Sequence, residues 1–430
     1  MAKQKFGRRV VLVDGCRLPF QRSGTGYKDL LSYDLAREVL KGLIQKTEFD
    51  PEQIDRIILG TVIQEVKTGN VARDASLAAG FPNHIPANTV TMACISSNQA
   101  ITSGIEAIQT GHADVVVAGG TETMSDVPIR LSRKVRQKLL ESRKSKNPLD
   151  YLKLLKGLRP ADIKPEIPEV AEYSTGETMG ESCDKMAAIF GISRREQDAF
   201  ALRSHQCAEK ARRDNLFDDE LIPAVIPPDF EPVTSDNGIR ADSTMEKLEK
   251  LRPAFIKTHG TITAGNASFL SDGASAVLIM AEEKAELLGL QPKAWLTHYC
   301  YVAQDPTEEL LLGPAYAIPR VLDAAGLTLS DISVFELHEA FAGQVLSVLE
   351  ALNSVSFAKN HLGRKSKVGE IPMDKLNTLG GSLSLGHPFG ATGARLVTTA
   401  ANRLKREKGK YALVSACAAG GLGHAMLLER

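Results

Sequence analysis

The sequence lacks the features that mark membrane and secreted proteins. No apolar run in its 430 residues approaches the ~18 residues that a membrane-spanning helix needs. The first residues, Met-Ala-Lys-Gln-Lys-Phe-Gly-Arg-Arg, have no apolar core of the kind found in a signal peptide. Because the stretch before the first expected strand is also short for a transit peptide, we expect a bacterial-type cytoplasm, or the mitochondrial matrix if a presequence is absent from this sequence.

Cysteine and net charge are scarce as well. Lysine and arginine number 52, and so do aspartate and glutamate, so the molecule as a whole has no basic excess that would favour nucleic acid. Neither C-x-x-C nor Cys/His ligand spacing occurs, which argues against a disulfide framework and against a zinc site, and fits a reducing compartment. The six cysteines are Cys16, Cys94, Cys183, Cys207, Cys300 and Cys417.

The order of apolar runs and helical periodicity predicts a layered α/β fold. Residues 10–13 and 54–59 are expected to be strands and residues 33–45 an amphipathic helix, an order that implies parallel pairing of the two strands. Further strands are expected at residues 88–93, 114–120, 261–268, 274–280 and 411–416. The expected organisation is an N-terminal half at 1–120, an inserted loop domain at 121–250, a return to the N-terminal half at 251–280 and a C-terminal half at 281–430.

The second α/β unit repeats the first. Residues 316–337, a helix and then a strand, echo residues 33–59, which places His338 in the loop after the later strand. In the same way the strand end at Cys94 and its following helix correspond to His387 and its following helix. Two equivalent units packed about a pseudo-two-fold axis bring equivalent strand ends together, so we expect Cys94 and His387 to face each other.

Glycines surround His387 and Cys417, in Gly380-Gly-Ser-Leu-Ser-Leu-Gly-His-Pro-Phe-Gly-Ala-Thr-Gly393 and Cys417-Ala-Ala-Gly-Gly-Leu-Gly423. Glycine permits positive φ and a close approach to a ligand, so both residues are expected on turns that expose them to a substrate. Taken alone, a histidine beside proline is more often a turn residue, and a cysteine after an apolar strand is more often a core residue.

Six motifs occur in order along essentially the whole chain. They are Thr91-Met-Ala-Cys-Ile-Ser-Ser-Asn-Gln-Ala, Gly119-Gly-Thr-Glu-Thr-Met-Ser, Thr263-Ala-Gly-Asn-Ala-Ser, His338-Glu-Ala-Phe, Gly380-Gly-Ser-Leu-Ser-Leu-Gly-His-Pro and Cys417-Ala-Ala-Gly-Gly-Leu-Gly. Together they make the sequence resemble the thiolase family and, within it, the β subunits of the trifunctional enzymes of fatty-acid oxidation. The resemblance implies a duplicated α-β-α-β-α layered fold and a loop domain for coenzyme A. It also implies thiolytic cleavage of 3-ketoacyl-CoA by an acetyl-CoA C-acyltransferase, with coenzyme A as substrate and no permanently bound cofactor or metal.

The resemblance also assigns roles within the site. Cys94 is the expected nucleophile, before a helix whose N-terminal dipole favours thiolate, and His387 the base that takes its proton. Cys417 is expected to move the proton of the acetyl-CoA carbanion. Backbone N–H groups of Cys94 and Ala419 are the expected oxyanion donors. His338 stands where many family members have an asparagine that holds a water, so it is expected to donate directly; a purely structural role for it remains the alternative.

The resemblance extends to contacts with coenzyme A and the acyl chain. The residues expected to make them are Ser268, Ala264, Phe255, Met179 and Phe341. Small and apolar residues at these positions can equally belong to the core.

Three other functions are weighed against a 3-ketoacyl-CoA thiolase of medium or long chains. An acetoacetyl-CoA thiolase would prefer the four-carbon substrate. A decarboxylating ketoacyl synthase would want a histidine where Cys417 stands. A scaffolding or membrane-docking subunit that has lost activity is disfavoured by the intact set of Cys94, His387 and Cys417.

A basic segment lies within the expected insertion. Residues 129–159 hold eleven lysines and arginines against Glu141 and Asp150. Leu131, Val135 and Leu139 recur at helical spacing, and a second apolar run follows at 151–158, which predicts basic amphipathic helices on a surface. We expect contact with an anionic membrane and with a trifunctional α subunit, on a homodimeric core; a solvated insertion that attracts coenzyme A phosphates is the alternative.

Overall fold

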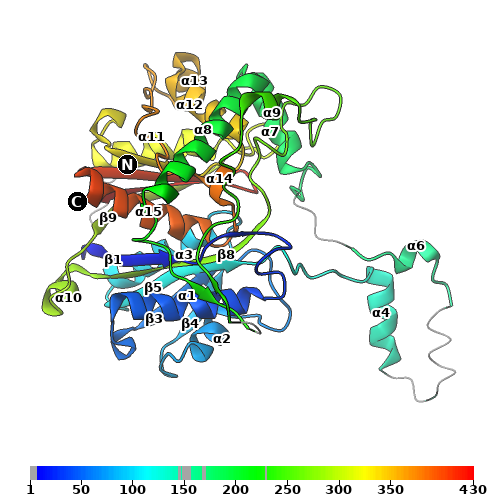
Figure 1. Cartoon of the computed structure of the whole chain (residues 1–430), viewed down its shortest axis with the longest axis horizontal. Helices are drawn as coiled ribbons and strands as arrows, with labels where there is room; N and C mark the ends of the chain where they lie inside the picture. The colour runs from blue at the N-terminus through cyan, green and yellow to red at the C-terminus, as the bar shows by residue number, and fades with distance from the viewer. Residues whose placement is uncertain (1–6, 144–146, 148–155, 167–170, 228–229) are drawn as a thin grey trace.

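The computed structural model describes residues 7–143, 147, 156–166, 171–227 and 230–430, and its core is layered α-β-α-β-α (Figure 1). The N-terminal half contains β1 (Val10–Arg17), α1 (Ser32–Thr47), β3 (Arg56–Gly60), α2 (Val71–Ala78), β4 (Ala87–Val90), α3 (Ser96–Gln109), β5 (Val115–Glu122) and β8 (Ser271–Ala281). The C-terminal half contains β9 (Ala294–Ala303), α11 (Gly313–Ala325), β10 (Val334–Leu337), α12 (Ala342–Asn353), α14 (Ser382–Leu385), α15 (Thr392–Glu407), β11 (Tyr411–Ala418) and β12 (Leu422–Glu429).

The strands confirm the predicted duplication. They follow the order β10-β11-β12-β9-β1-β8-β5-β3-β4. In one half β3 pairs parallel with β5, β5 antiparallel with β8, and β8 antiparallel with β1. In the other half β10, β11, β12 and β9 repeat that sequence of parallel and antiparallel pairs. The halves join where β1 pairs with β9.

Three apolar cores separate the layers. One core joins α1 and α2 to the outer face of the first half of the sheet, and another joins α11 and α12 to the outer face of the second half. The third core lies between the halves and is built on α3 and α15, with Ile101, Ile105 and Ile108 of α3 all buried as their spacing predicts. The two central helices therefore begin side by side, each just after one of the predicted site residues.

Two expectations about β1 are wrong. β1 continues past Asp14 to Arg17, with a bulge between Leu12 and Asp14 that keeps the ladder to β8 intact. β1 and β3 run in the same direction but are not paired, because β5 and β8 lie between them. β8 comes from far along the chain. The local β-α-β order therefore predicts the direction of β1 and β3 correctly but does not predict which strands lie between them.

Residues 261–268, expected as a strand, form a turn-rich loop. The Asn266 side chain accepts a hydrogen bond from the Thr263 N–H (2.7 Å) and donates to the Thr261 carbonyl (3.1 Å) and to Asp198 (2.9 Å). These side-chain bonds take the place of a strand ladder. The loop thereby reaches the end of β10 through the hydrogen bond from the Ser268 N–H to the Ala340 carbonyl.

The segment between β5 and β8 carries α4 (Arg133–Ser142), α6 (Pro160–Ile163), α7 (Met179–Ile189), α8 (Arg194–Arg213) and α9 (Met245–Glu249). Figure 1 shows α4 and α6 standing away from the layered body, while α7 and α8 lie against its upper layer. Lys134 and Arg136 of α4 form ion pairs with Asp162 and Glu166 of the α6 segment. The predicted basic helix is therefore present as α4, whereas most of the second apolar run, residues 151–155, lies outside the described residues.

Candidate active site

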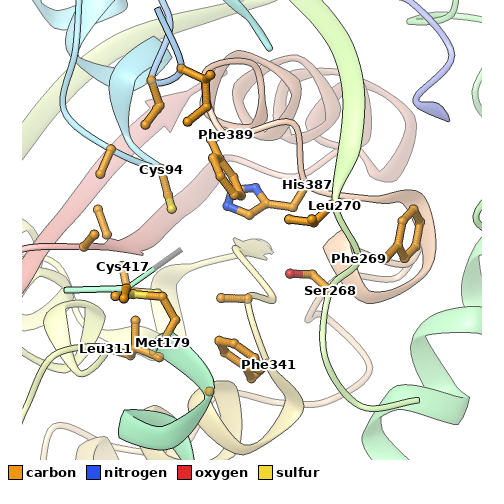
Figure 2. A pocket seen from close by; sticks show the side chains of 18 of the residues that line it. Cys94, Met179, Ser268, Phe269, Leu270, Leu311, Phe341, His387, Phe389 and Cys417 are labelled. Atoms are coloured by element: carbon orange, nitrogen blue, oxygen red, sulfur yellow. The ribbon is translucent and has the colours of Figure 1, made fainter. Parts of the chain in front are cut away.

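A cavity of about 410 Å³ opens where the two halves meet (Figure 2). Its wall is mostly apolar and comes from both halves and from the segment between β5 and β8. It is lined by Val62, Ile63, Ala93, Cys94, Ala171, Met179, Gly180, Phe255, Ser268, Phe269, Leu270, Leu311, Ala340, Phe341, His387, Phe389, Cys417, Ala418 and Ala419. The structure thus brings Cys94, His387 and Cys417 to one cavity.

Cys94 lies in the tight turn between β4 and α3. Ala93 takes a φ of 45°, in the left-handed region that residues with a side chain seldom adopt. The hydroxyl of Ser96 fixes this turn by accepting from the Met92 N–H (2.8 Å) and donating to the Ala93 carbonyl (2.7 Å). The strained turn presents the half-buried Cys94 thiol to the cavity at the start of α3.

The Cys94 thiol is protonated in the free protein. Burial raises its pKa to about 12, and the backbone N–H of Ala419, which points at the sulfur, opposes that rise only in part. The position of Cys94 before a helix had predicted a stabilised thiolate. The structure differs, because the helix dipole does not outweigh the effect of burial on the pKa. A base has to remove the proton when substrate arrives.

His387 is placed to be that base. Gly386 precedes it with a φ of 107°, and the His387 N–H donates to the hydroxyl of Ser271 (3.0 Å). The Thr392 hydroxyl donates to the Pro388 carbonyl (3.0 Å), so its oxygen accepts from Nδ1 of His387 (2.7 Å). The proton of the neutral ring is therefore on Nδ1, and Nε2 carries a lone pair.

Nε2 of His387 is buried and has no hydrogen-bond partner among the described residues. Its ring reaches into the cavity beside Cys94 (Figure 2). Burial lowers the pKa of His387 to about 3, with the positive charge of Arg395 adding to the effect. The imidazole is thus neutral at physiological pH and free to accept a proton.

Cys417 is the last residue but one of β11, on the opposite side of the cavity, and is 1% exposed. Burial raises the pKa of its thiol, and Cys94 raises it further. In the turn that follows, Gly420 and Gly421 have positive φ, whereas Ala419 does not. An alanine at position 419 is therefore not strained. The Ala419 N–H consequently keeps its direction toward Cys94.

His338 packs against His387 and is not among the residues that line the cavity. The two ring centroids are 4.0 Å apart. Nδ1 of His338 is 2.9 Å from the hydroxyl of Ser382, while Nε2 is buried without a hydrogen-bond partner in the described part of the chain. Burial lowers the pKa of His338 well below its ordinary value, and His387 and Arg395 lower it further, so this ring is neutral too.

Glu122, at the end of β5, joins the loops of the two halves. Its carboxylate accepts from the N–H groups of Val62 (3.0 Å), Ile63 (2.9 Å) and Gly390 (3.0 Å) and from the hydroxyl of Thr61 (3.2 Å). Burial raises its pKa to about 7 in spite of these donors. Glu122 is not among the predicted site residues, although it lies inside one of the six motifs.

The predicted coenzyme A and acyl contacts divide into two groups. Phe255, Met179, Phe341 and Ser268 line the cavity, whereas Ala264 is exposed and does not. Residues that were not predicted as site residues also form its wall, and they include Val62, Ile63, Ala171, Phe269, Leu270, Leu311 and Phe389. Val62 and Ile63 follow β3, and Phe269, Leu270 and Phe389 follow motif residues, whereas Ala171 and Leu311 have no such signal in the sequence.

Neither a metal group nor a spanning helix is found in the described ranges. No cluster of three or more His, Cys, Asp or Glu side chains there has the arrangement that holds a metal ion. Within the same ranges, none of the helices combines the length and apolarity needed to cross a membrane. The chemistry available in the cavity is that of two thiols, a neutral imidazole base and backbone N–H donors, which suits transfer of an acyl group through a thioester.

Comparison with known proteins agrees with this chemistry. Residues 10–283 match the family described as "Thiolase, N-terminal domain", and residues 290–430 match "Thiolase, C-terminal domain". The mitochondrial trifunctional enzyme subunit beta of Bos taurus is 58% identical over 98% of this chain and 88% of its own length. A 3-ketoacyl-CoA thiolase of Yersinia enterocolitica is 45% identical over 98% of this chain and 97% of its own. The crystal structure of human mitochondrial 3-ketoacyl-CoA thiolase in complex with CoA superposes with a TM-score of 0.85 at 31% identity, covering 99% of this chain and 98% of that one.

Proposed function

This chain belongs to the thiolase family, and from that premise we propose that it is a 3-ketoacyl-CoA thiolase of fatty-acid β-oxidation. It cleaves 3-ketoacyl-CoA with coenzyme A to acetyl-CoA and a shortened acyl-CoA. The observation that carries the proposal is the meeting of Cys94, the unpartnered Nε2 of His387 and Cys417 in one apolar cavity.

The first step is acylation of Cys94. Its sulfur attacks the 3-keto carbon while Nε2 of His387 takes the thiol proton, so that no free thiolate has to form in the buried site. The negative charge that develops on the former keto oxygen needs donors. The backbone N–H groups of Cys94 and Ala419 are proposed for this oxygen.

Cleavage of the carbon–carbon bond then leaves the acyl group on Cys94 and releases acetyl-CoA as its carbanion. The thiol of Cys417 gives a proton to that carbanion, while charge on the thioester oxygen is stabilised by His338 and by the protonated His387. Burial keeps Cys417 in the thiol form, so the proton is present when it is needed. In the second half, Cys417 takes a proton from the incoming coenzyme A thiol, whose sulfur attacks the acyl-enzyme and frees Cys94, and His387 returns its proton to the leaving sulfur.

The apolar wall suits the acyl chain. Met179, Phe255 and Phe341 are proposed to contact it, and Ser268 to contact the pantetheine arm of coenzyme A. Ala264 is proposed as a coenzyme A contact only outside the cavity, since its side chain is exposed. Residues 121–250 are proposed as the loop domain that covers this site.

Thiolysis rates across 3-ketoacyl-CoA substrates from four to sixteen carbons test this function. We expect measurable activity that rises with chain length, as the extended apolar wall allows. A marked preference for the four-carbon substrate would support an acetoacetyl-CoA thiolase instead. Absence of thiolysis at every length, in a folded protein, would favour the scaffolding alternative.

We propose that the protein works as a homodimer bound to a second subunit with hydratase and hydroxyacyl-CoA dehydrogenase activities. The name of its trifunctional relatives, which are beta subunits, supports the second subunit. β4 supports the homodimer, because it is the edge of the sheet, is only half-buried and pairs with β3 alone among the described strands. Mass measured in solution, with and without a co-expressed partner, tests both assemblies. The same relatives are mitochondrial and the Yersinia relative is bacterial, so the proposed compartment is the mitochondrial matrix or the bacterial cytoplasm.

The projecting helix α4 is proposed to contact an anionic membrane. Leu131 and Leu139 are 44% and 50% exposed, beside the basic side chains of the same segment. Each basic residue near an anionic surface contributes ~1 kcal/mol, and this attraction is screened within a Debye length. Binding should therefore weaken steeply with salt.

Charge reversal tests the membrane contact. Lys134 and Arg136 pair with acidic residues, so a variant that reverses them also breaks the projecting segment. Reversing Arg133, Lys138 and Arg143 to glutamate leaves those pairs in place and should abolish co-sedimentation with cardiolipin-containing vesicles without changing thiolysis. The matched control reverses three lysines on the body, Lys359, Lys365 and Lys408, all of them exposed. Equal sedimentation of the two variants would contradict the proposed contact.

A further inference from the structure

A buried chain of polar side chains leads from β10 to the ring of His338. Glu336 on β10 lies 3.7 Å from Nη1 of Arg395 on α15. Nη2 of the same guanidinium donates to the hydroxyl of Ser382 (3.1 Å), and that hydroxyl is 2.9 Å from Nδ1 of His338. All four residues are at most 1% exposed. None of these contacts reaches the cavity, so the chain acts on substrate only through Nε2 of His338. That nitrogen lies outside the cavity lining, next to His387, so a substrate oxygen has to enter beyond the lining to reach it.

Hydrogen bonding along this chain has one direction. A guanidinium can only donate, so the Ser382 oxygen accepts from Arg395. The hydroxyl then has a single proton to give, and its acceptor among the described residues is Nδ1 of His338. If Nδ1 carried the ring proton instead, the buried Ser382 hydroxyl would be left without an acceptor, which costs free energy. Nδ1 therefore accepts, and the proton of the neutral ring is on Nε2.

His387 shows the opposite arrangement only 4.0 Å away. The hydroxyl of Thr392 already donates to the Pro388 carbonyl, so Thr392 accepts from Nδ1 of His387. In both rings Nε2 is the atom without a partner in the described structure. The Ser382 hydroxyl accepts from a guanidinium and so donates to His338, whereas the Thr392 hydroxyl donates to a carbonyl and so accepts from His387. Nε2 of His338 is therefore a hydrogen-bond donor, and Nε2 of His387 is an acceptor.

We propose that Ser382 and Arg395 are positioning residues that hold His338 as its Nε2–H tautomer, so that Nε2 is a hydrogen-bond donor for a substrate oxygen. The inference rests on the proposed function for the identity of that oxygen, the thioester carbonyl oxygen of the acetyl-CoA group. The charge of Arg395 also disfavours a proton on Nδ1, so His338 does not compete with His387 for the proton of Cys94. Glu336, the acidic neighbour of this guanidinium at 3.7 Å, also accepts a hydrogen bond from Arg403 (2.8 Å).

The tautomer can be read without activity. Selective ¹⁵N labelling of histidine and long-range ¹H–¹⁵N correlation spectra of the free protein distinguish Nε2–H from Nδ1–H rings, and the variants His338→Asn and His387→Asn assign the two signals. We expect Nε2–H for His338 and Nδ1–H for His387. In Ser382→Ala we expect His338 to populate both tautomers while the His387 signal stays unchanged. A His338 ring that is Nδ1–H in the unaltered protein would overturn the proposal.

Kinetics supply the second test. Complete loss of an oxyanion donor typically costs ~10²–10³ in kcat, but a His338 ring that populates both tautomers loses only the share of molecules without Nε2–H. Ser382→Ala should therefore lower kcat by a few-fold and leave KM nearly unchanged, whereas Ser382→Thr, which keeps the hydroxyl, should retain full activity. In a His338→Asn background, Ser382→Ala should have no further effect, because an asparagine amide has no tautomer to set. The matched control is Ser384→Ala on the same short helix, whose hydroxyl contacts Ser204 and Gly381 and not His338. Equal losses from Ser382→Ala in both backgrounds, or equal losses from the two alanine variants, would assign Ser382 a structural role.

These two measurements separate the inference from the proposed function. If the unaltered protein shows no thiolysis but the predicted tautomers are present, the function fails and the positioning of His338 stands. If thiolysis is present and the tautomers are reversed, the positioning fails and the function stands. Arg395 is fully buried and its removal can prevent folding, so the test relies on Ser382.

Discussion

Removing the imidazole of His387 would leave Cys94 to lose its proton unaided. With a thiol pKa of about 12, the thiolate fraction at pH 7 is about 10⁻⁵, since each pH unit below the pKa lowers it tenfold. Because this fraction still reacts without a base, removing His387 cannot slow acylation by more than ~10⁵-fold. A general base usually contributes ~10²–10⁴-fold. For His387→Ala we therefore expect acetylation of Cys94 by acetyl-CoA to slow by ~10²–10⁴-fold at pH 7.

The pH dependence of that residual rate is the sharper part of the prediction. In the variant it should climb about tenfold per unit from about pH 6 to about pH 9, as the thiolate fraction does. In the unaltered protein the rate should be nearly flat, because a base with a pKa of about 3 stays neutral over this range.

Single-turnover mixing with acetyl-CoA, followed by the mass of the intact protein, measures the reaction. His387→Gln is the matched control, since it fills more of the ring's volume than alanine and should show the same slope. A variant rate within tenfold of the unaltered protein, or one that does not change with pH, would refute the assignment of His387 as the base.

The remaining predictions concern the two thiols and the buried histidines. Cys94→Ser should show no covalent acetyl group by mass spectrometry, because an alkoxide is much harder to form than a thiolate; an acetylated variant would count against Cys94 as the nucleophile. Cys417→Ala should still be acetylated on Cys94 while thiolysis falls by ~10²–10⁴-fold, since only the proton transfer to the carbanion is lost; near-normal thiolysis would show that another group moves that proton. Burial lowers the pKa of His205 to about 4 and of His387 and His424 to about 3, so below about pH 6.5 the unfolded chain binds protons that the folded chain does not. Their contribution to the free energy of unfolding should therefore fall as the pH falls, by ~1.4 kcal/mol per pH unit for each histidine, and urea unfolding at about pH 7 and about pH 5 measures it. Replacing the fully buried His424 by glutamine should make that fall less steep, and an unchanged slope would contradict this origin.

Much of the fold follows from local pattern and repetition. The helices α1, α3 and α15 show apolar periodicity, and the repeat of helix and strand gave the correspondence between β3 and β10 before any pairing was known. The neighbours of β1 could not be predicted from local sequence, because β8, which pairs with it, follows the long insertion in the chain. The β-branched residues of 261–268 predict a strand, whereas the Asn266 side chain bonds two residues of its own loop, Thr261 and Thr263, and anchors the loop to the distant Asp198.

The candidate site divides in the same way. Cys94, His387 and Cys417 were visible as reactive residues at strand ends, and the structure brings them to one cavity. Their protonation was not visible, because it depends on burial and on partners from distant segments. Thr392, Ser382 and Arg395 sit on or beside helices where their sequence context is that of ordinary polar residues. Only their contacts show that they decide which ring nitrogen carries a proton.

The position of β12 determines when the C-terminal half of the sheet can be completed during folding. It is the last strand of the sheet along the chain, yet it lies between β9 and β11 and pairs with both over most of its length. A nascent chain that has reached β11 therefore holds two strands with open edges, and such edges invite pairing with other chains. Many of the contacts that close the C-terminal half are long-range, which slows folding relative to a fold of local contacts. A polypeptide truncated before β12 is thus expected to aggregate rather than to yield a smaller working enzyme.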